Sequence, residues 1–121
     1  MSETQLLQKL RKDCSELQEN SIAKLVGGTT QKNSGGTRFG GGDVHTKLFL
    51  VEAKTCTTSH TGFNVRKEWL VKAATQAFEQ GKRYSSLAFR FEPHGEDFFI
   101  VSSSLFKKLL EHVEESESDE S

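Results

Sequence analysis

Cysteine, proline, tryptophan and long apolar runs are all scarce in this sequence, and their scarcity excludes several classes of protein. The 121 residues include two cysteines, one proline and one tryptophan, and 34% of them are hydrophobic. Cys14 and Cys56 fit no metal-ligand spacing, and two thiols without a signal-like leader indicate a reduced, intracellular protein. No apolar run approaches the roughly 18 residues of a membrane helix. We therefore expect a cytoplasmic protein that neither spans a membrane nor is secreted.

Acidic residues are sparse in most of the chain and concentrated at its end. Six of the seventeen acids lie in the last eleven residues, which contain no Lys or Arg, so residues 1–110 carry 16 basic and 11 acidic groups. A modestly basic body with an acidic tail is compatible with a polyanionic partner, although the signal is weak alone. We predict one domain over residues 1–113, followed by a disordered acidic tail over residues 114–121.

Hydrophobic periodicity predicts an α/β protein whose first half is a helix, a loop and a hairpin. Leucines at three- and four-residue spacing predict a helix over residues 4–26, which Gly27 and Gly28 end. The segment 27–42 contains seven glycines and reads as a loop that can approach a ligand closely. Residues 44–54 then predict a β-hairpin with its turn near Thr46-Lys47.

The second half predicts another helix, another hairpin and a final helix. The helix covers residues 64–80, with Asn64 as its N-cap and Gly81 at its end. Strands are predicted over 85–92 and 98–101. A serine at 102–104 caps the final helix, whose apolar positions are expected to face the core: Leu105, Phe106, Leu109, Leu110 and Val113. The order is α-β-β-(β)-α-β-β-α.

The second strand of the first predicted hairpin begins with apolar residues and continues with charged ones. Leu48 to Val51 has the composition of a buried strand, yet Glu52 and Lys54 continue it. These two side chains point to one face because side chains alternate along a strand, and the hairpin brings Asp43 back toward Val51 or Glu52. Two carboxylates beside an ammonium suit a hard cation such as Mg²⁺ and a phosphate substrate. The alternative is a solvated strand end with Asp43 as a turn residue.

The charged residues and their surroundings resemble the PD-(D/E)xK nuclease superfamily, in particular Holliday junction resolvases of the archaeal type and their phage relatives. In that family an N-terminal helix supplies a glutamate, and a loop with glycine and serine follows, then an Asp and a Glu-x-Lys strand. The matching positions here are Glu19, Ser34-Gly35-Gly36, Gly42-Asp43 and Glu52-Ala53-Lys54. Gly42 departs from the motif, because it stands where the family has proline.

The resemblance implies a restriction-endonuclease-like fold, with a central mixed sheet flanked by helices in the order α-β-β-β-α-β-β-α. It implies that Asp43, Glu52 and Glu19 hold Mg²⁺, for which Mn²⁺ can substitute, and that Lys54 is the catalytic lysine. Glu16, one turn before Glu19, is the alternative helix acid. Ser34 would lie near the scissile phosphate, and the expected DNA contacts are Lys32, Ser34, Arg38, Arg66 and Lys67.

The function that the resemblance implies is metal-dependent cleavage of branched DNA, with Holliday junctions as the expected substrate and a homodimer as the expected assembly. A phage-encoded chain would act in the host cytoplasm. Three alternatives stay open from the sequence. The first is a nicking or recombination and repair endonuclease of the same fold, the second is a non-catalytic DNA-binding module, and the third is a structural protein in which Glu52 and Lys54 form an ion pair.

Overall fold

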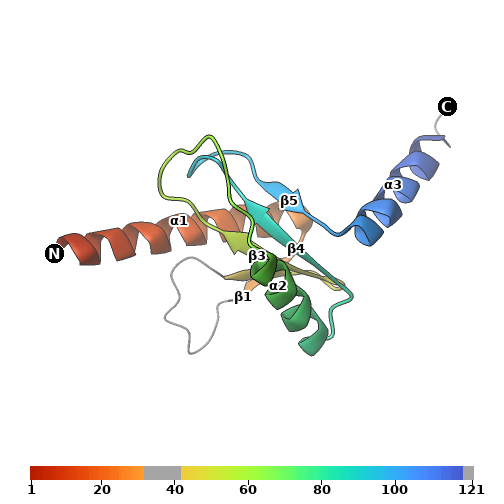
Figure 1. Cartoon of the computed structure of the whole chain (residues 1–121), viewed down its shortest axis with the longest axis horizontal. Helices are drawn as coiled ribbons and strands as arrows, with labels where there is room; N and C mark the ends of the chain where they lie inside the picture. The colour runs from red at the N-terminus through yellow and green to blue at the C-terminus, as the bar shows by residue number, and fades with distance from the viewer. Residues whose placement is uncertain (32–41, 119–121) are drawn as a thin grey trace.

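The computed structural model describes residues 1–31 and 42–118, which form an α/β fold with a five-stranded mixed sheet and three helices (Figure 1). The predicted α/β class and order of elements are confirmed. The elements are α1 (Glu3–Val26), β1 (Thr29–Gln31), β2 (Asp43–His45), β3 (Phe49–Lys54), α2 (Lys67–Glu79), β4 (Tyr84–Phe89), β5 (Phe98–Ile100) and α3 (Ser103–Ser118).

The sheet has the strand order β1-β2-β3-β4-β5. β3 and β4 run parallel, with α2 as the crossover between them, whereas the other neighbouring strands are antiparallel. The predicted first hairpin is confirmed, since Thr46 donates its backbone N–H to the carbonyl of Phe49 across the turn. The prediction of a loop from Gly27 is wrong for Thr29–Gln31, which pairs with β2 as an edge strand.

The two faces of the sheet are covered by different helices. Ile22 of α1 packs with Val44, Val51, Ala53 and Ala88, which alternation places on one face. The other face of β3 carries Glu52 and Lys54, and α2 covers it with its buried residues Ala73 and Ala77 and with Trp69 beside Lys54. The central strand β3 is therefore enclosed on both sides, which explains why its charged residues are buried.

Helix α1 does not bury the face that its leucines predict. It begins with a capping box between Ser2 and Gln5 and ends at Gly27, whose positive φ of 70° suits glycine. The buried residues are Ser15, Gln18, Glu19 and Ile22, whereas the leucines at 6, 7, 10, 17 and 25 are exposed. The periodicity identified the helix correctly but not its buried side, because polar contacts hold that side to the sheet.

Helix α2 begins later than predicted. Its N-cap is Arg66, whose side chain does not cap the helix, so the prediction of Asn64 as the cap is wrong. The ring of Phe63 stacks on Phe89 of β4 with centroids 4.4 Å apart, so the segment before α2 contacts the sheet. Near the end of the helix, the side chain of Phe78 is 85% exposed.

Helix α3 extends away from the sheet (Figure 1). Ser102 accepts a hydrogen bond from the backbone N–H of Leu105, as the serine cap predicts. Leu105 is the one buried residue of the helix, so the core placement of Phe106, Leu109, Leu110 and Val113 is wrong. The helix also continues to Ser118, five residues into the tail predicted to be disordered.

None of the three described helices combines the length and apolar character that a bilayer crossing requires. Cys14 and Cys56 are both free thiols, as predicted from their number.

Candidate functional site

The centre of the candidate site is a pair of carboxylates on adjacent strands. Asp43 in β2 and Glu52 in β3 are direct Cα partners in the antiparallel ladder, so their side chains project from the same face. Both are buried, Asp43 at 3% and Glu52 at 7% exposure. The alternative of a solvated strand end with a turn residue is therefore wrong for this pair.

Lys54 completes the same face of β3. Its ammonium Nζ lies 3.3 Å from Oε1 of Glu52 and 4.3 Å from the centroid of the Trp69 ring. A carboxylate on one side and an aromatic face on another restrict a side chain that is otherwise flexible. Trp69 is thus half-buried against the site lysine.

Glu19 reaches the site from α1. Its Oε2 accepts hydrogen bonds from the hydroxyl of Ser15, at 2.5 Å, and from the backbone N–H of Gly42, at 3.0 Å. Gly42 directly precedes Asp43, so the second bond ties α1 to the start of β2. Glu16, the alternative helix acid, lies one turn earlier and is half-buried.

The contact with Glu19 gives a physical reason for glycine at position 42. A Cβ added here would clash with the Glu19 carboxylate, and a proline would also remove the N–H that this carboxylate accepts. The close approach of Glu19 therefore requires glycine. The sequence contained two signals for this contact, the glycine before Asp43 and the serine one helical turn before Glu19, and neither was interpreted in that way.

Burial and the neighbouring carboxylates raise the proton affinity of Asp43. The pKa of Asp43 is raised from 3.8 to about 6, mainly by burial and then by repulsion from Glu52 and Glu19, while Lys72 and Lys54 act in the opposite direction. Near neutral pH an ionised Asp43 thus adds negative charge to a buried group of acids, and a cation would relieve that repulsion.

Unpaired oxygens identify where the site could accept a ligand. Oε2 of Glu52 and Oε1 of Gln76, in α2, are buried without a hydrogen-bond partner in the described part of the chain. A buried polar atom without a partner is costly, so it marks a position that favours a bound cation or water.

The described residues fit a cation held by two carboxylates better than one held by three. Asp43 and Glu52 face each other across the ladder and Glu52 keeps a free oxygen, whereas Oε2 of Glu19 is occupied by Ser15 and Gly42. Within residues 1–31 and 42–118, no group of three or more His, Cys, Asp or Glu side chains is arranged to hold a metal ion.

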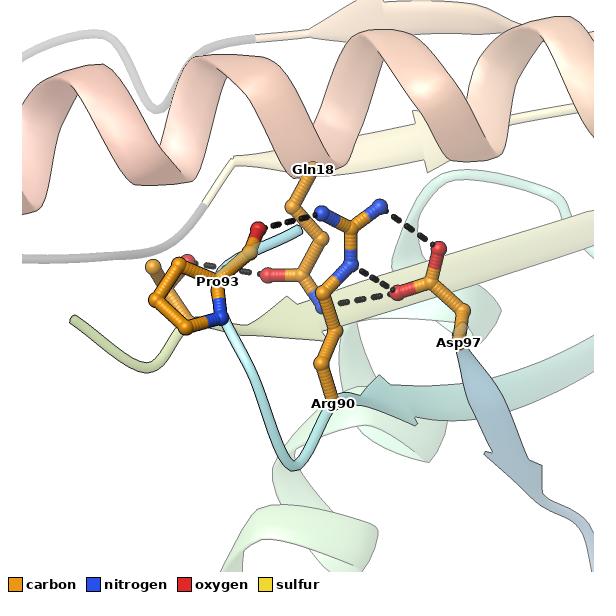
Figure 2. A network of polar contacts seen from close by, with 5 residues as sticks. Gln18, Arg90, Pro93 and Asp97 are labelled. Carbon is orange, nitrogen blue, oxygen red and sulfur yellow. Dashed lines mark hydrogen bonds and ion pairs between the residues drawn. The ribbon is translucent and has the colours of Figure 1, made fainter. Parts of the chain in front are cut away.

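A buried polar network lies beside the site and connects α1 to the segments that follow β3 and β4 (Figure 2). Arg90, after β4, binds both oxygens of Asp97 at 2.8 and 2.9 Å and donates to the carbonyl of Pro93. Gln18 of α1 donates to Asp97 and accepts from the hydroxyl of Thr55, which follows Lys54. Glu19 and Lys54 each adjoin a member of this network, which the sequence analysis missed because its members are far apart in the chain.

The predicted DNA contacts are only partly described. Lys32, Ser34 and Arg38 lie outside the described residues. Arg66 and Lys67 are exposed at the start of α2, where Arg66 forms an exposed ion pair with Glu68 at 3.6 Å. Their exposure is compatible with the predicted contact to a DNA backbone.

No family model, curated protein or solved structure matches the chain.

Proposed function

We propose that the protein is a metal-dependent endonuclease that hydrolyses phosphodiester bonds in branched DNA, with the Holliday junction as its substrate. The observation that carries the proposal is the buried pair Asp43 and Glu52, directly opposed on two strands, with the ammonium of Lys54 3.3 Å from Glu52. This arrangement supports the resemblance of Asp43 and Glu52-Ala53-Lys54 to the PD-(D/E)xK motif. A restriction-endonuclease-like fold is part of the proposal.

In this proposal Asp43 and Glu52 hold Mg²⁺, for which Mn²⁺ can substitute. The ion would supply an activated water and neutralise charge on the scissile phosphate. Support comes from the free Oε2 of Glu52 and from the raised pKa of Asp43, because both indicate carboxylates without enough positive charge around them.

The remaining side chains have separate roles. Lys54, held between Glu52 and Trp69, donates hydrogen bonds to the attacking water or to the phosphate as negative charge develops. Glu19, fixed by Ser15 and Gly42, adds negative charge beside Asp43 and strengthens cation binding. Ser34, Lys32, Arg38, Arg66 and Lys67 are proposed to contact the DNA backbone.

A purely structural role for the Glu52–Lys54 ion pair accounts for less of the site. An ion pair explains the position of Lys54, but it leaves Oε2 of Glu52 unpaired and places a second buried carboxylate, Asp43, beside it. A fold selected for stability alone would replace such groups, since buried like charges are costly. The site therefore favours catalysis over a structural pair or a binding module without chemistry.

The substrate is tested by a cleavage assay on a four-way junction, a duplex, a flap and single-stranded DNA, each with Mg²⁺, with Mn²⁺ or with EDTA. The proposal predicts Mg²⁺-dependent cuts in the junction and much slower cutting of the linear duplex. Equal cutting of duplex and junction would overturn the junction substrate and retain the nuclease. Absence of cutting in every substrate with Mg²⁺ or Mn²⁺ would overturn the nuclease.

A further inference from the structure

The distal part of α3 carries an apolar stripe that the body of the protein leaves uncovered. Phe106, Leu109, Leu110 and Val113 recur at three- and four-residue spacing and are between 42% and 56% exposed. The adjoining first turn is different, because Leu105 is buried at 4% exposure. A helix with such a stripe gains most of its stability by burying it, so the stripe indicates a binding surface.

A groove that could receive an apolar helix lies at the base of α3. It has a volume of about 450 Å³, and its walls include Leu70 and Ala74 of α2, Tyr84 of β4 and Ile100 of β5. Leu105 and Lys108, from the first turns of α3, also line it. The groove and the stripe are therefore adjacent on the surface, yet the stripe lies beyond the groove.

The α3 of the same chain is poorly placed to fill this groove. The helix is continuous from Ser103 to Ser118, about 24 Å at 1.5 Å per residue, and it starts in the wall of the groove. Its distal turns consequently extend away from the body (Figure 1). Bringing Leu110 into the groove of its own chain would require breaking the helix or its Ser102 cap.

The charges of the helix and of the groove are complementary. Beyond Lys108 the described part of α3 has four glutamates and no lysine or arginine, with Glu111, Glu114, Glu115 and Glu117 as its charged residues. Arg83 and Lys108 are the charged residues that line the groove. An incoming helix with an acidic distal half would thus meet a basic rim, and a second α3 is such a helix.

We propose that two copies of the chain exchange their α3 helices, each helix laying Phe106, Leu109, Leu110 and Val113 in the groove between α2 and β4 of the other copy. The exchange is reciprocal, so one surface serves both copies and the assembly closes as a symmetric dimer. The dimer does not depend on the proposed nuclease activity and would form in a protein without it.

Light scattering after gel filtration tests the dimer on the full chain. The native protein is expected to have the mass of two chains, and Leu109→Asp combined with Val113→Asp the mass of one, with unchanged helix content by circular dichroism. Glu115→Gln is the matched control, because helical spacing places position 115 opposite the stripe, and it stays dimeric. Arg83→Glu is expected to weaken the dimer. A native monomer at all concentrations would overturn the proposal.

Cross-linking between two variants tests the groove itself. Leu110→Cys and Ala74→Cys are made in separate chains that also carry Cys14→Ser and Cys56→Ser, then mixed and treated with a short bismaleimide. The expected product is a dimer in which mass spectrometry finds position 110 joined to position 74. Asp13→Cys, exposed on α1, replaces Ala74→Cys in the control mixture and gives no such product. A dimer that never joins positions 110 and 74 would overturn the groove as the binding site.

Discussion

Gly42 shows how a single residue can set the geometry of a site without contributing a side chain. Its backbone N–H donates to Glu19, and its missing Cβ leaves the space in which that carboxylate lies. Both properties are needed together, because alanine keeps the N–H but fills the space, and proline loses the N–H as well. Glycine at this position therefore permits the close approach of the Glu19 carboxylate.

We predict that Gly42→Ala displaces the Glu19 carboxylate. The added methyl group overpacks a buried position, which costs about 1–3 kcal/mol of unfolding free energy. A shift of about 1 Å at the site is expected to lower the cleavage rate on the order of 100-fold. Urea denaturation and the junction cleavage assay measure the two effects. Gly62→Ala is the control, because a Cβ there meets nothing within 4 Å. Equal effects of the two substitutions would refute the role assigned to Gly42.

The raised pKa of Asp43 predicts how the stability of the fold depends on pH. Its pKa is about 6 in the folded chain against 3.8 for the ordinary group, so the folded state binds this proton more tightly than the unfolded state does. Ionising Asp43 costs no folding free energy below pH 3.8 and its full cost above pH 6, so the unfolding free energy falls as the pH rises from 3.8 to 6. The loss of unfolding free energy is on the order of 3 kcal/mol.

The measurement is the unfolding free energy from pH 4 to pH 8 in EDTA, compared between the native chain and Asp43→Asn. The substituted chain is expected to lose less stability over this range and to be the more stable of the two at pH 8. Added Mg²⁺ should raise the melting temperature of the native chain and leave that of Asp43→Asn unchanged. Identical pH profiles for the two chains would contradict the assigned burial and repulsion.

At this scale the sequence predicted the acidic residues of the site but not what holds them. Asp43, Glu52 and Lys54 follow from strand alternation and a short hairpin, which are local rules, and the structure places the two carboxylates opposite each other. Gly42 and Ser15 act through Glu19, which comes from a helix that is distant in sequence from the hairpin. The bond between Gly42 and Glu19 depends on how α1 docks on the sheet, so the glycine and the serine could be interpreted as signals for it only with the structure.

Between the elements, the polar network in Figure 2 holds α1 against the sheet. Arg90 and Asp97 are 5% and 6% exposed and form a two-point ion pair, and Gln18 joins the pair to α1. Thr55 connects the same glutamine to the end of β3. A buried arginine is tolerated only when its charge and hydrogen bonds are satisfied, as they are here. The network thus fixes α1 relative to the strand that carries Lys54.

We predict that Asp97→Ala lowers the unfolding free energy by about 3–5 kcal/mol, because it leaves the Arg90 guanidinium buried without its partner. Replacing the neighbouring exposed Glu96 by alanine should change stability by no more than about 0.5 kcal/mol. Chemical denaturation of the two variants provides the comparison. A loss below about 1 kcal/mol for Asp97→Ala would show that the pair does not hold the elements together.

The ends of α1 and the serine-capped start of α3 were predicted well, whereas the start of α2 and the packing of the helices were predicted poorly. The leucines of α1 and the stripe of α3 have the spacing of core faces, yet both are exposed. Hydrophobic periodicity indicates that one face of a helix is apolar, but it does not indicate which surface covers that face. Ser15, Gln18 and Glu19 are buried on α1 through hydrogen bonds that hydrophobic periodicity does not detect.

At the scale of the whole molecule, exposed apolar side chains gather on elements that reach beyond the sheet. Leu6, Leu7 and Leu10 lie in the N-terminal part of α1, which extends past the sheet in Figure 1, and the α3 stripe lies at the opposite end. A single chain leaves this surface in water, so the molecule has the character of one part of an assembly. The proposed exchange of α3 covers one of these surfaces.

We propose that Asp43 and Glu52 hold a divalent cation for DNA cleavage, and matched carboxamide variants test this proposal. Cleavage of a labelled four-way junction is measured over a Mg²⁺ titration for the native chain, Glu52→Gln and Asp13→Asn, and binding of the same junction is measured by fluorescence anisotropy in EDTA. Asp13 is the control because it is an exposed carboxylate on α1, paired with Lys9. The account predicts equal binding by all three, Mg²⁺-dependent cleavage by the native chain and by Asp13→Asn, and none by Glu52→Gln. Cleavage by Glu52→Gln at the native rate, or by the native chain in EDTA, would contradict it.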